Sequence, residues 1–235
     1  MTSLTFLLIW MAASSESLRS ITMDIPMVIQ KIRGEAERVK LPSPVLDSGT
    51  SIEKALLKRR SVREYGHEPL TLPEISQLLW AAQGVTERKE GLRAAPSAGA
   101  LYPLEVYLVA GDVDGIEQGV YKYKPHGHEL VKVVEGDKRM DIYRASLYQE
   151  PVKDAPALIV ISAIYQRTTI KYGERGIRYV HMEVGHAAEN VYLQAVALNL
   201  GTVVVGAFHD EDVRKALNMP KDETPLYVMP VGRLR

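Results

Sequence analysis

The run Ala157–Ala163 (ALIVISA), directly after Pro156, decides the fold of this 235-residue chain. An uninterrupted apolar run of this length is typical of a central β-strand that is buried on both faces. Further strands are predicted from apolar or alternating patterns at Leu104–Ala110, Val120–Lys124, Glu129–Val134, Thr202–Ala207 and Leu226–Val231. The turn Pro125–His128 separates two of these segments and predicts a hairpin.

Helices are predicted on both sides of these strands. Thr71–Glu74 looks like a helix start with proline in the first turn, and Ile75, Leu78, Leu79 and Ala82 follow at amphipathic spacing up to Gly84. The longest helical pattern is Tyr179–Leu200, with Gly201 at its end. Shorter helices are predicted at 25–39, after the capping-box pattern Thr50–Glu53, and after Asp210, whereas the polar segment 85–94 is predicted to be a loop.

The order of these elements lacks the regular alternation of strands and helices that a parallel sheet requires. We therefore predict an α+β fold with a central, mainly antiparallel sheet flanked by helices. The chain shows no internal repeat, no low-complexity tract and no second domain.

The composition argues against several classes of function. The chain carries 29 Lys and Arg against 29 Asp and Glu, which argues against broad electrostatic binding to nucleic acid or to anionic membranes. It contains no cysteine, and this excludes disulfides, thiolate nucleophiles and cysteine-ligated zinc or iron–sulfur sites.

The apolar run Leu4–Ala13 (LTFLLIWMAA) is too short to span a bilayer. It resembles the core of a secretion signal, but no Lys or Arg precedes it. A true start at Met11 or Met23 is the alternative. We favour a cytoplasmic protein with a peripheral N-terminal segment and no stable membrane insertion.

Two cationic segments are candidate anion sites. Lys58–Arg63 (KRRSVR) places four cations and a hydroxyl in six residues, and Gly232–Arg235 (GRLR) ends the chain. Arginine forms forked hydrogen bonds with phosphate, although such a cluster also serves solubility on a surface helix.

Two further segments could surround a ligand. Ala95–Pro103 (APSAGALYP) consists of small residues between prolines, which lets the backbone approach a flat molecule closely or simply makes a tight connection. Ser97 lacks the glycine spacing of a hydrolase nucleophile. Arg167–Tyr179 follows the central strand and offers a lysine and tyrosines for proton transfer, with a solvated loop as the alternative.

Metal and nucleotide motifs are not supported. His181 and His186 are five positions apart and therefore point about 140° apart around a helix, so they cannot form a zinc-binding face with Glu183. The chain contains no dinucleotide-binding or P-loop glycine pattern.

Taken together, these segments resemble the nitroreductase superfamily of enzymes that bind flavin mononucleotide (FMN). The most similar branch is that of the SagB-type dehydrogenases, which oxidise azoline rings in modified peptides. The resemblance covers about residues 50–233 and rests on Arg59–Arg63 (RRSVR), Pro96–Tyr107 (PSAGALYPLEVY), Lys171–Tyr179 (KYGERGIRY), Glu183–Asn190 (EVGHAAEN) and Val205–Phe208 (VGAF).

The resemblance implies a homodimer with two FMN sites at its interface. It assigns residues 46–235 to a single FMN-binding domain and leaves residues 1–45 outside the match. It implies that Arg59, Ser61 and Arg63 hold the phosphate and ribityl chain, with Arg60 near the ring. Arg233 is expected as a second phosphate ligand, with Arg235 as the competitor.

The resemblance also implies the residues around the flavin ring. Pro96, Ser97, Ala98 and Gly99 are expected against the isoalloxazine, contributed by the partner subunit. Gln149 is expected at the pyrimidine edge, and Gly206 and Ala207 near N5. Lys171 and Tyr172 match the pair that removes protons in azoline oxidases.

These roles imply an FMN-dependent oxidoreductase that transfers hydride in a ping-pong cycle. Its reaction is either SagB-type dehydrogenation of a small molecule or peptide, or NADH- or NADPH-driven reduction as in nitroreductases. A non-enzymatic flavin-binding or sensor protein is the alternative. An RNA-binding module is disfavoured, because only Tyr65 is available for base stacking near the arginines.

Overall fold

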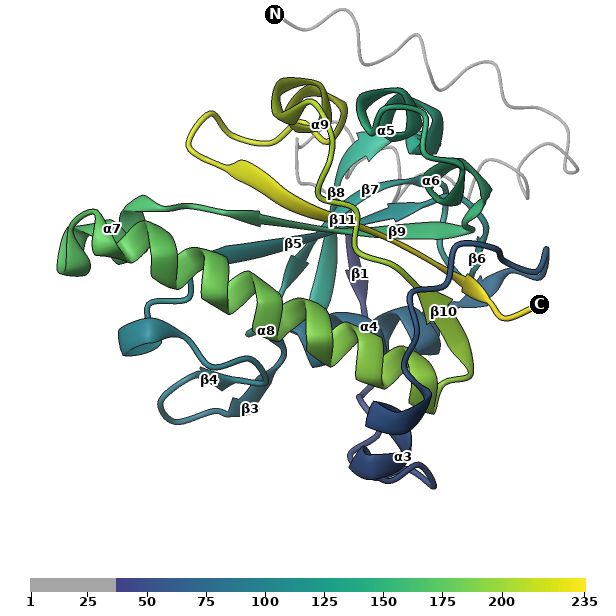
Figure 1. Cartoon of the computed structure of the whole chain (residues 1–235), viewed down its shortest axis with the longest axis horizontal. Helices are drawn as coiled ribbons and strands as arrows, with labels where there is room; N and C mark the ends of the chain where they lie inside the picture. Colours follow the sequence, from purple (N-terminus) through teal and green to yellow (C-terminus); the bar gives the residue numbers. More distant parts are fainter. Residues whose placement is uncertain (1–36) are drawn as a thin grey trace, which may run out of the picture. The chain divides into compact units, whose positions relative to one another are not determined.

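The computed structural model describes residues 37–235, which form a seven-stranded sheet with neighbouring helices (Figure 1). The strand order is β1-β8-β7-β5-β9-β11-β10, and every neighbouring pair is antiparallel. The strands are β1 (Arg38–Lys40), β5 (Leu104–Ala110), β7 (Gly119–Lys124), β8 (Glu129–Glu135), β9 (Ala157–Ala163), β10 (Leu200–Thr202) and β11 (Thr224–Arg233). The predicted antiparallel α+β class is confirmed.

Strand β9 is central, as predicted from its apolar sequence. All seven of its residues are buried. Val160 pairs with Tyr107 of β5 on one side and with Val228 of β11 on the other. A strand that is hydrogen-bonded on both sides and covered on both faces needs continuous apolar character, which explains the uninterrupted run.

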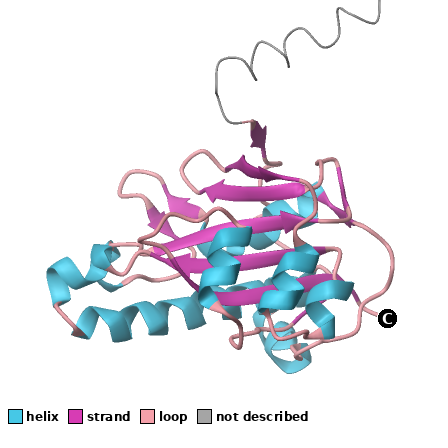
Figure 2. Ribbon diagram, turned by 90° about the horizontal axis from the view of Figure 1, so that it is seen from above, coloured by secondary structure: helices cyan, strands magenta, loops and turns pink. Residues whose placement is uncertain are grey.

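Helices cover both faces of the sheet (Figure 2). Side chains of α4 and α8 pack with Leu104, Val106 and Leu108 on one face, whereas α5, α6 and α9 pack with Tyr107 and Val109 on the other. The helices are α3 (Ile52–Lys58), α4 (Leu72–Gln83), α5 (Arg139–Ala145), α6 (Glu150–Asp154), α7 (Gln166–Tyr172), α8 (Arg175–Ala197) and α9 (Asp210–Ala216).

The ends of α4 follow from its sequence. Thr71 and Glu74 form a reciprocal capping box, Pro73 lies in the first turn, and Gly84 is the C-cap residue. Helix α3 begins one residue later than the Thr50–Glu53 pattern predicts, because the Ser51 side chain accepts the hydrogen bond from the Lys54 N–H. The last helix likewise has His209, not Asp210, at its N-cap position.

Other expectations were wrong at element boundaries. Residues 38–39, expected at the end of a helix, belong to strand β1, which pairs with β8; residues 25–36 lie outside the described part. The segment 85–94 forms a small hairpin of β3 (Val85–Glu87) and β4 (Leu92–Arg93). The strand expected at 202–207 is limited to Thr202 and an isolated bridge between Val205 and Val228.

The segment after β9, for which a solvated loop was the alternative to a ligand site, is mostly helical. It forms α7, a break at Gly173 and then α8, which begins at Arg175 and ends at Ala197. Gly201 therefore lies within β10, and Asn199 is the residue that takes a left-handed conformation after the helix, with φ of 56°. Within residues 37–235, no helix combines the length and apolar character needed to cross a membrane.

Candidate functional site

The predicted phosphate residues Arg59 and Ser61 converge on Tyr192 of α8. The Arg59 guanidinium lies 5.2 Å from the centre of the Tyr192 ring, and its Nε is 4.0 Å from a Glu189 carboxylate oxygen. The Ser61 Oγ is 3.2 Å from the Tyr192 hydroxyl oxygen. A half-buried arginine and an exposed serine are thus held side by side at the surface, where both can donate to an anion.

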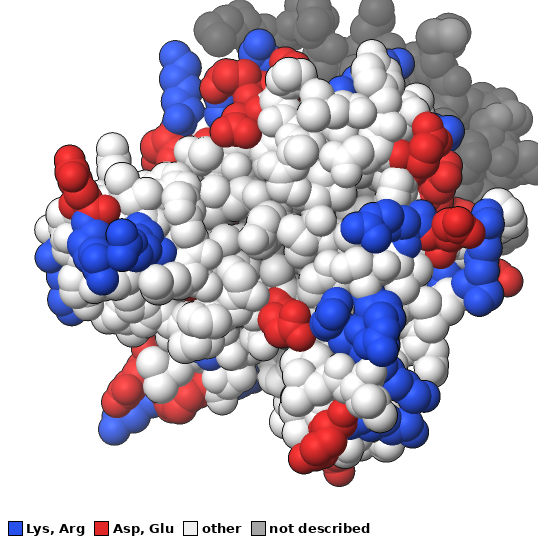
Figure 3. Space-filling model, in the orientation of Figure 1, with Lys and Arg blue, Asp and Glu red and all other residues white. Residues whose placement is uncertain are grey.

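Arg60 and Arg63 extend this cationic surface. Both side chains are exposed, and Arg60 donates to the backbone carbonyls of Leu57 and Arg59 at 3.1 and 2.6 Å. Lysine and arginine side chains gather over α3 and the segment that follows it (lower right of Figure 3). A cavity of about 370 Å³ opens beside them and is lined in part by Lys54, Lys58, Arg60 and Tyr192.

The predicted ring-edge residues lie further along the same surface. The Val204 N–H donates to the Tyr192 hydroxyl at 2.8 Å, and Gly206 and Ala207 follow as exposed residues. The Gln149 Nε2 donates to the Ala207 carbonyl at 3.0 Å, although the two residues are 58 positions apart. Tyr192 thus contacts Arg59, Ser61 and Val204, and the short segment 204–207 continues this strip of contacts to Gln149.

Tyr192 was not predicted as a site residue. It lies two positions beyond the Glu183–Asn190 motif, and its side chain is 9% exposed. The only signal in the sequence was its position after that motif, because an aromatic residue on an apolar helix face is ordinarily part of the core.

A second cluster brings Gly99 together with Lys171 and Tyr172. Gly99 lies in the short 3-10 turn η1 (Ala98–Ala100) with φ of 64°. A Cβ atom added there would lie 2.7 Å from the Tyr172 hydroxyl and 3.0 Å from the Lys171 Nζ. The Lys171 Nζ is also 5.4 Å from the centre of the Tyr172 ring. The small-residue loop and the predicted proton-transfer pair thus form one local site.

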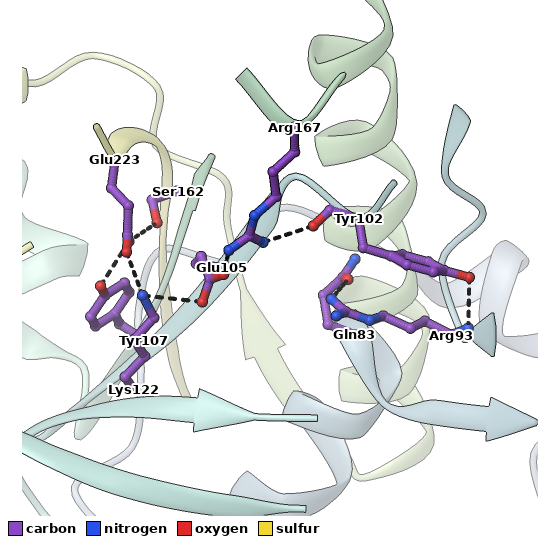
Figure 4. Close-up of polar contacts among 9 residues, drawn as sticks. All are labelled: Gln83, Arg93, Tyr102, Glu105, Tyr107, Lys122, Ser162, Arg167 and Glu223. Carbon is purple, nitrogen blue, oxygen red and sulfur yellow. Dashed lines mark hydrogen bonds and ion pairs between the residues drawn. The ribbon is translucent and has the colours of Figure 1, made fainter. Parts of the chain in front are cut away.

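A chain of ion pairs fixes this second cluster to the sheet (Figure 4). Arg167, four residues before Lys171 on α7, donates to the Tyr102 carbonyl at 2.9 Å and to Glu105 at 2.6 Å. Glu105 lies 3.1 Å from Lys122, and Lys122 also pairs with Glu223. The chain therefore connects helix α7, the end of the 96–103 loop and the sheet interior.

Glu223 anchors the inner end of this chain. Its carboxylate is 1% exposed and accepts hydrogen bonds from Tyr107 at 2.7 Å and Ser162 at 3.1 Å. Burial opposes ionisation of Glu105, but Lys122 and Arg167 hold the pKa of its carboxyl below the usual value. A fully bonded network of this kind holds its members in a single geometry.

Tyr102 connects the 96–103 loop to Arg93. Its φ is 47°, a conformation that is rarely adopted by an aromatic residue. The Arg93 guanidinium lies 4.4 Å from the centre of the Tyr102 ring, and the Tyr102 N–H donates to the Ser97 Oγ at 2.9 Å. Arg93 in turn donates to the Gln83 side chain at 2.9 Å. The backbone strain at Tyr102 is thus offset by contacts on both sides of the loop.

The two clusters lie at different places along α8 within one chain. The loop cluster meets the helix near Glu183, through Ser97, whereas the phosphate cluster meets it at Tyr192. Nine residues of helix separate these positions, which is about 14 Å.

The two C-terminal arginines lie beside residues 64–66, the segment that follows Arg63, where Tyr65 and Leu234 form a β-bridge. Arg233 forms a forked ion pair with Glu74, with the second contact at 2.9 Å, and donates to the Pro69 carbonyl at 3.1 Å. Arg235 donates to the Tyr65 carbonyl at 3.0 Å and pairs with Glu64 at 3.2 Å. In the described structure Arg233 supports the N-terminus of α4, and its expected contact with the phosphate stays a prediction.

Replacing Arg233 with alanine is expected to lower the free energy of unfolding by about 2 kcal/mol, because a charge-assisted pair at the half-buried Glu74 carboxylate is lost. Burial opposes ionisation of Glu74, but Arg233 and Thr71 keep its pKa below the usual value. Urea denaturation measures the change. Arg235→Ala is the matched control: its pair with Glu64 is exposed, so we expect a change below about 0.5 kcal/mol. An equal loss in both variants contradicts this role.

Gly99→Ala is expected to cost about 1–2 kcal/mol of stability, because an L-residue is strained at this positive φ. It should also displace the tips of Lys171 and Tyr172. Gly136→Ala is the control, since Gly136 has φ of 76° with no atom within 4 Å of its added Cβ. Chemical denaturation measures the free energy of unfolding of both variants. The loss in Gly136→Ala gives the cost of backbone strain, and any additional loss in Gly99→Ala comes from the contacts with Lys171 and Tyr172. Equal losses mean that the contact with Lys171 and Tyr172 contributes nothing.

Two further observations concern metal-binding clusters and cavities in the described part of the chain. Among the described residues, no three His, Cys, Asp or Glu side chains gather as a metal ion would require. A larger groove of about 510 Å³ lies between α3, α4 and α8, and none of the predicted site residues lines it.

Comparison with known proteins identifies the family. Residues 56–233 match the model of the Nitroreductase family. "Putative nitroreductase MJ1384" of Methanocaldococcus jannaschii is 49% identical over 200 residues, covering 85% of this chain and 98% of that protein. A crystal structure described as a putative nitroreductase from Ralstonia eutropha superposes with a TM-score of 0.75 at 30% identity, covering 84% of this chain and 90% of the other.

A third match is a chain of a synthetase complex that was solved with a truncated pro-peptide. A chain of the Escherichia coli microcin synthetase McbBCD complex, solved with truncated pro-MccB17 bound, has a TM-score of 0.66 at 25% identity and covers 90% of this chain and 83% of its own. The fold and these matches define a nitroreductase-like oxidoreductase. The chain belongs to the nitroreductase family, and the predicted resemblance to it, near the SagB-type branch, is confirmed.

Proposed function

We propose that this protein is an FMN-dependent oxidoreductase that carries hydride between two substrates in a ping-pong cycle. The observation that carries the proposal is the strip of contacts from Arg59 and Ser61 through Tyr192 to Ala207 and Gln149. It places cationic and hydroxyl donors at one end and a neutral amide with exposed backbone at the other. Family membership supports the same assignment.

The donor set fits the chemistry of FMN. Arg59, Ser61 and Arg63 would hold the dianionic phosphate, because guanidinium and hydroxyl groups are its preferred donors. Arg60 would lie toward the ring, where a cation stabilises negative charge on the reduced cofactor. The Gln149 amide would meet the pyrimidine edge, and the backbone of Gly206 and Ala207 would approach N5. Bound FMN supplies hydride transfer at N5, which no side chain of this chain can supply.

Lys171 and Tyr172 are proposed as the catalytic pair. Both border Gly99 in the 96–99 loop, so a substrate held against that loop would lie within their reach. In a dehydrogenation, the Lys171 amine would accept the proton that leaves as hydride departs from the neighbouring carbon, and Tyr172 would orient this amine. Arg167 positions the pair through Glu105 and the Tyr102 carbonyl.

We propose a homodimer in which each site is shared between subunits. The two clusters lie about 14 Å apart along α8, and the 96–99 loop and the Arg59 donors are proposed to act on one flavin from different subunits. Exposed apolar side chains on α3, α7 and α8 offer surface for a partner: Ile52, Leu56, Leu57, Ile170, Ile177 and Met182. The partner's Pro96, Ser97, Ala98 and Gly99 would then lie against the ring.

The substrate is proposed to be a small molecule or a peptide with an oxidisable ring. Similarity to a chain of the McbBCD complex supports a peptide substrate. Similarity to the putative nitroreductase supports NADH- or NADPH-driven reduction instead. A cytoplasmic location remains part of the proposal.

Anaerobic half-reactions test the proposed function. FMN-loaded protein mixed with NADPH should lose its visible absorbance, and adding a quinone or nitroaromatic acceptor should restore it. Parallel lines in double-reciprocal plots would support the ping-pong cycle. A protein that binds FMN yet turns over neither NADH, NADPH nor an azoline-containing peptide would instead be the flavin-binding sensor.

A further inference from the structure

The cavity of about 370 Å³ beside the Arg59–Arg63 segment is here called the Lys58 cavity. Ser61 forms a parallel β-bridge with Thr202, so the backbone is extended there and successive side chains point to opposite sides. Arg60 and Val62 line the Lys58 cavity, whereas none of the three residues proposed to hold the FMN phosphate lines it. The cavity is therefore separate from the phosphate cluster.

Three cations surround the mouth of the Lys58 cavity. Lys54 and Lys58 are exposed and lie one turn apart on α3, and the exposed Arg60 follows the helix. Of the residues described, no Asp or Glu lines the cavity, and neither lysine forms an ion pair within residues 37–235. Like charges four positions apart repel each other on a helix, and a bound anion would remove this repulsion.

The guanidinium group of Arg60 is held in place at this mouth. Its Nη1 donates to the carbonyls of Leu57 and Arg59 at 3.1 and 2.6 Å, which leaves Nε and Nη2 for a ligand. A side chain that is already fixed loses little conformational freedom when it binds an anion.

The floor of the Lys58 cavity combines apolar side chains with an unsatisfied hydroxyl. Ala195 and Leu200 are buried there, and Thr202 is only 1% exposed. The Thr202 Oγ1 atom has no hydrogen-bond partner in the described part of the chain. A buried hydroxyl without a partner is costly, and a ligand oxygen that reaches the floor would satisfy it. The floor thus points to a ligand independently of the charges at the mouth.

We propose that the Lys58 cavity binds a nucleoside phosphomonoester, with the phosphate at the cationic mouth and the nucleoside against the floor. Three cations suit a dianionic phosphate better than a singly charged carboxylate. The Thr202 hydroxyl and the Asn199 amide, set among apolar side chains, suit a sugar and a base better than an alkyl chain. The volume lies in the range of about 300–1,000 Å³ that is typical of small-molecule sites. This site is additional to the proposed flavin site.

Calorimetric titration of the FMN-saturated protein with adenosine 5′-monophosphate (AMP) tests the proposal, because FMN then fills its own phosphate site. We expect AMP to bind with a dissociation constant below about 1 mM. Adenosine lacks the phosphate and inorganic phosphate lacks the nucleoside, so each should bind at least about tenfold more weakly than AMP. AMP binding should also weaken as the salt concentration rises.

The variant Lys54→Gln with Lys58→Gln removes two charged donors, so AMP affinity should fall by about 10- to 100-fold. Its affinity for FMN should stay within about twofold of the wild type. Lys89→Gln with Lys221→Gln is the matched control, because it removes the same charge from exposed positions elsewhere and should leave AMP affinity within about twofold. Arg60 is left unchanged, since it is also proposed to act near the flavin ring.

Thr202→Val tests the floor. It replaces the hydroxyl with a methyl group, and AMP affinity should fall by about three- to tenfold, the value of one hydrogen bond. The Tm of the ligand-free variant should stay equal to that of the wild type or rise, because the lost hydroxyl has no partner. A clear fall in Tm means that this hydroxyl is bonded in the free protein, which overturns its role as a ligand contact.

The remaining outcomes separate the second site from the flavin site. Unchanged AMP affinity in the Lys54 and Lys58 variant overturns the site, and so does equal binding of adenosine or of inorganic phosphate. Displacement of AMP by one equivalent of FMN shows a single shared site and also overturns the proposal. If the protein takes up no FMN, the proposed function fails, while AMP binding that depends on Lys54 and Lys58 still supports the Lys58 cavity as a nucleotide site.

Discussion

Replacing Arg59 and Arg63 together with alanine is expected to weaken FMN binding by about 10²- to 10⁴-fold. Each guanidinium can give charge-assisted hydrogen bonds to the phosphate, and each such bond contributes roughly 1.5–3 kcal/mol. Arg59 is already held over Tyr192 beside Ser61, so little conformational freedom has to be lost on binding. Fluorescence titration of the double variant with FMN measures the change.

The controls for this result separate phosphate recognition from general charge. Arg88→Ala combined with Arg144→Ala removes the same number of positive charges from exposed positions elsewhere and should leave the affinity within about twofold. Riboflavin, which has no phosphate, should lose much less affinity than FMN in the Arg59 and Arg63 variant. Retention of FMN at unchanged affinity contradicts the assignment of the phosphate site.

Lys171→Ala is expected to slow the dehydrogenation of an azoline-containing peptide by about 10²- to 10⁴-fold while FMN stays bound. This range is typical of the loss of a general base. Reduction of the flavin by NADPH delivers a hydride without removing a proton from a carbon substrate, so its rate should change little. Single-turnover absorbance measurements of both half-reactions on the same variant test the difference.

Lys215→Ala, on the exposed surface of α9, is the matched control for the lost lysine. Tyr172→Phe should give a smaller loss than Lys171→Ala, because the proposed role of its hydroxyl is to orient the Lys171 amine. If Lys171→Ala oxidises the peptide at the wild-type rate, Lys171 is not the base. If wild-type protein oxidises no azoline peptide while it reduces quinones, the NAD(P)H-driven alternative is the better assignment.

The elements that could be predicted from the sequence are those whose stability is local. Strands β9 and β5 match the predicted ranges to the residue, because each is a mostly apolar run that directly follows a proline, although β5 contains Glu105. The capping box at the start of α4 was likewise predictable, since both partners lie within four residues. The antiparallel class followed from the element order.

The parts that could not be predicted depend on contacts between distant segments. The polar composition of Arg167–Tyr179 gave no sign of helix α7, which is held by the pair of Arg167 with Glu105, 62 positions away. The pairing of Arg233 with Glu74, which is 159 positions away, likewise had no signal in the sequence. The Glu183–Asn190 motif was recognised, yet nothing in it indicated that the Glu183 side chain is buried.

The contacts within each of the two clusters could not be predicted from the sequence either. The link between Gln149 and Ala207, and the approach of Gly99 to Lys171 and Tyr172, each join segments more than 50 positions apart. The resemblance supplied these residues as separate motifs. Their arrangement as two sites on one helix, α8, is what turns them into a specific proposal for a shared site between subunits.

The most direct test of the central claim is the flavin content of the purified protein. We would record the visible absorption spectrum before and after reconstitution with FMN and removal of free cofactor, then add NADPH without oxygen. The account predicts a yellow protein with stoichiometric FMN, whose spectrum bleaches with NADPH or with an oxidisable substrate. A colourless protein that cannot be reconstituted with FMN contradicts the account.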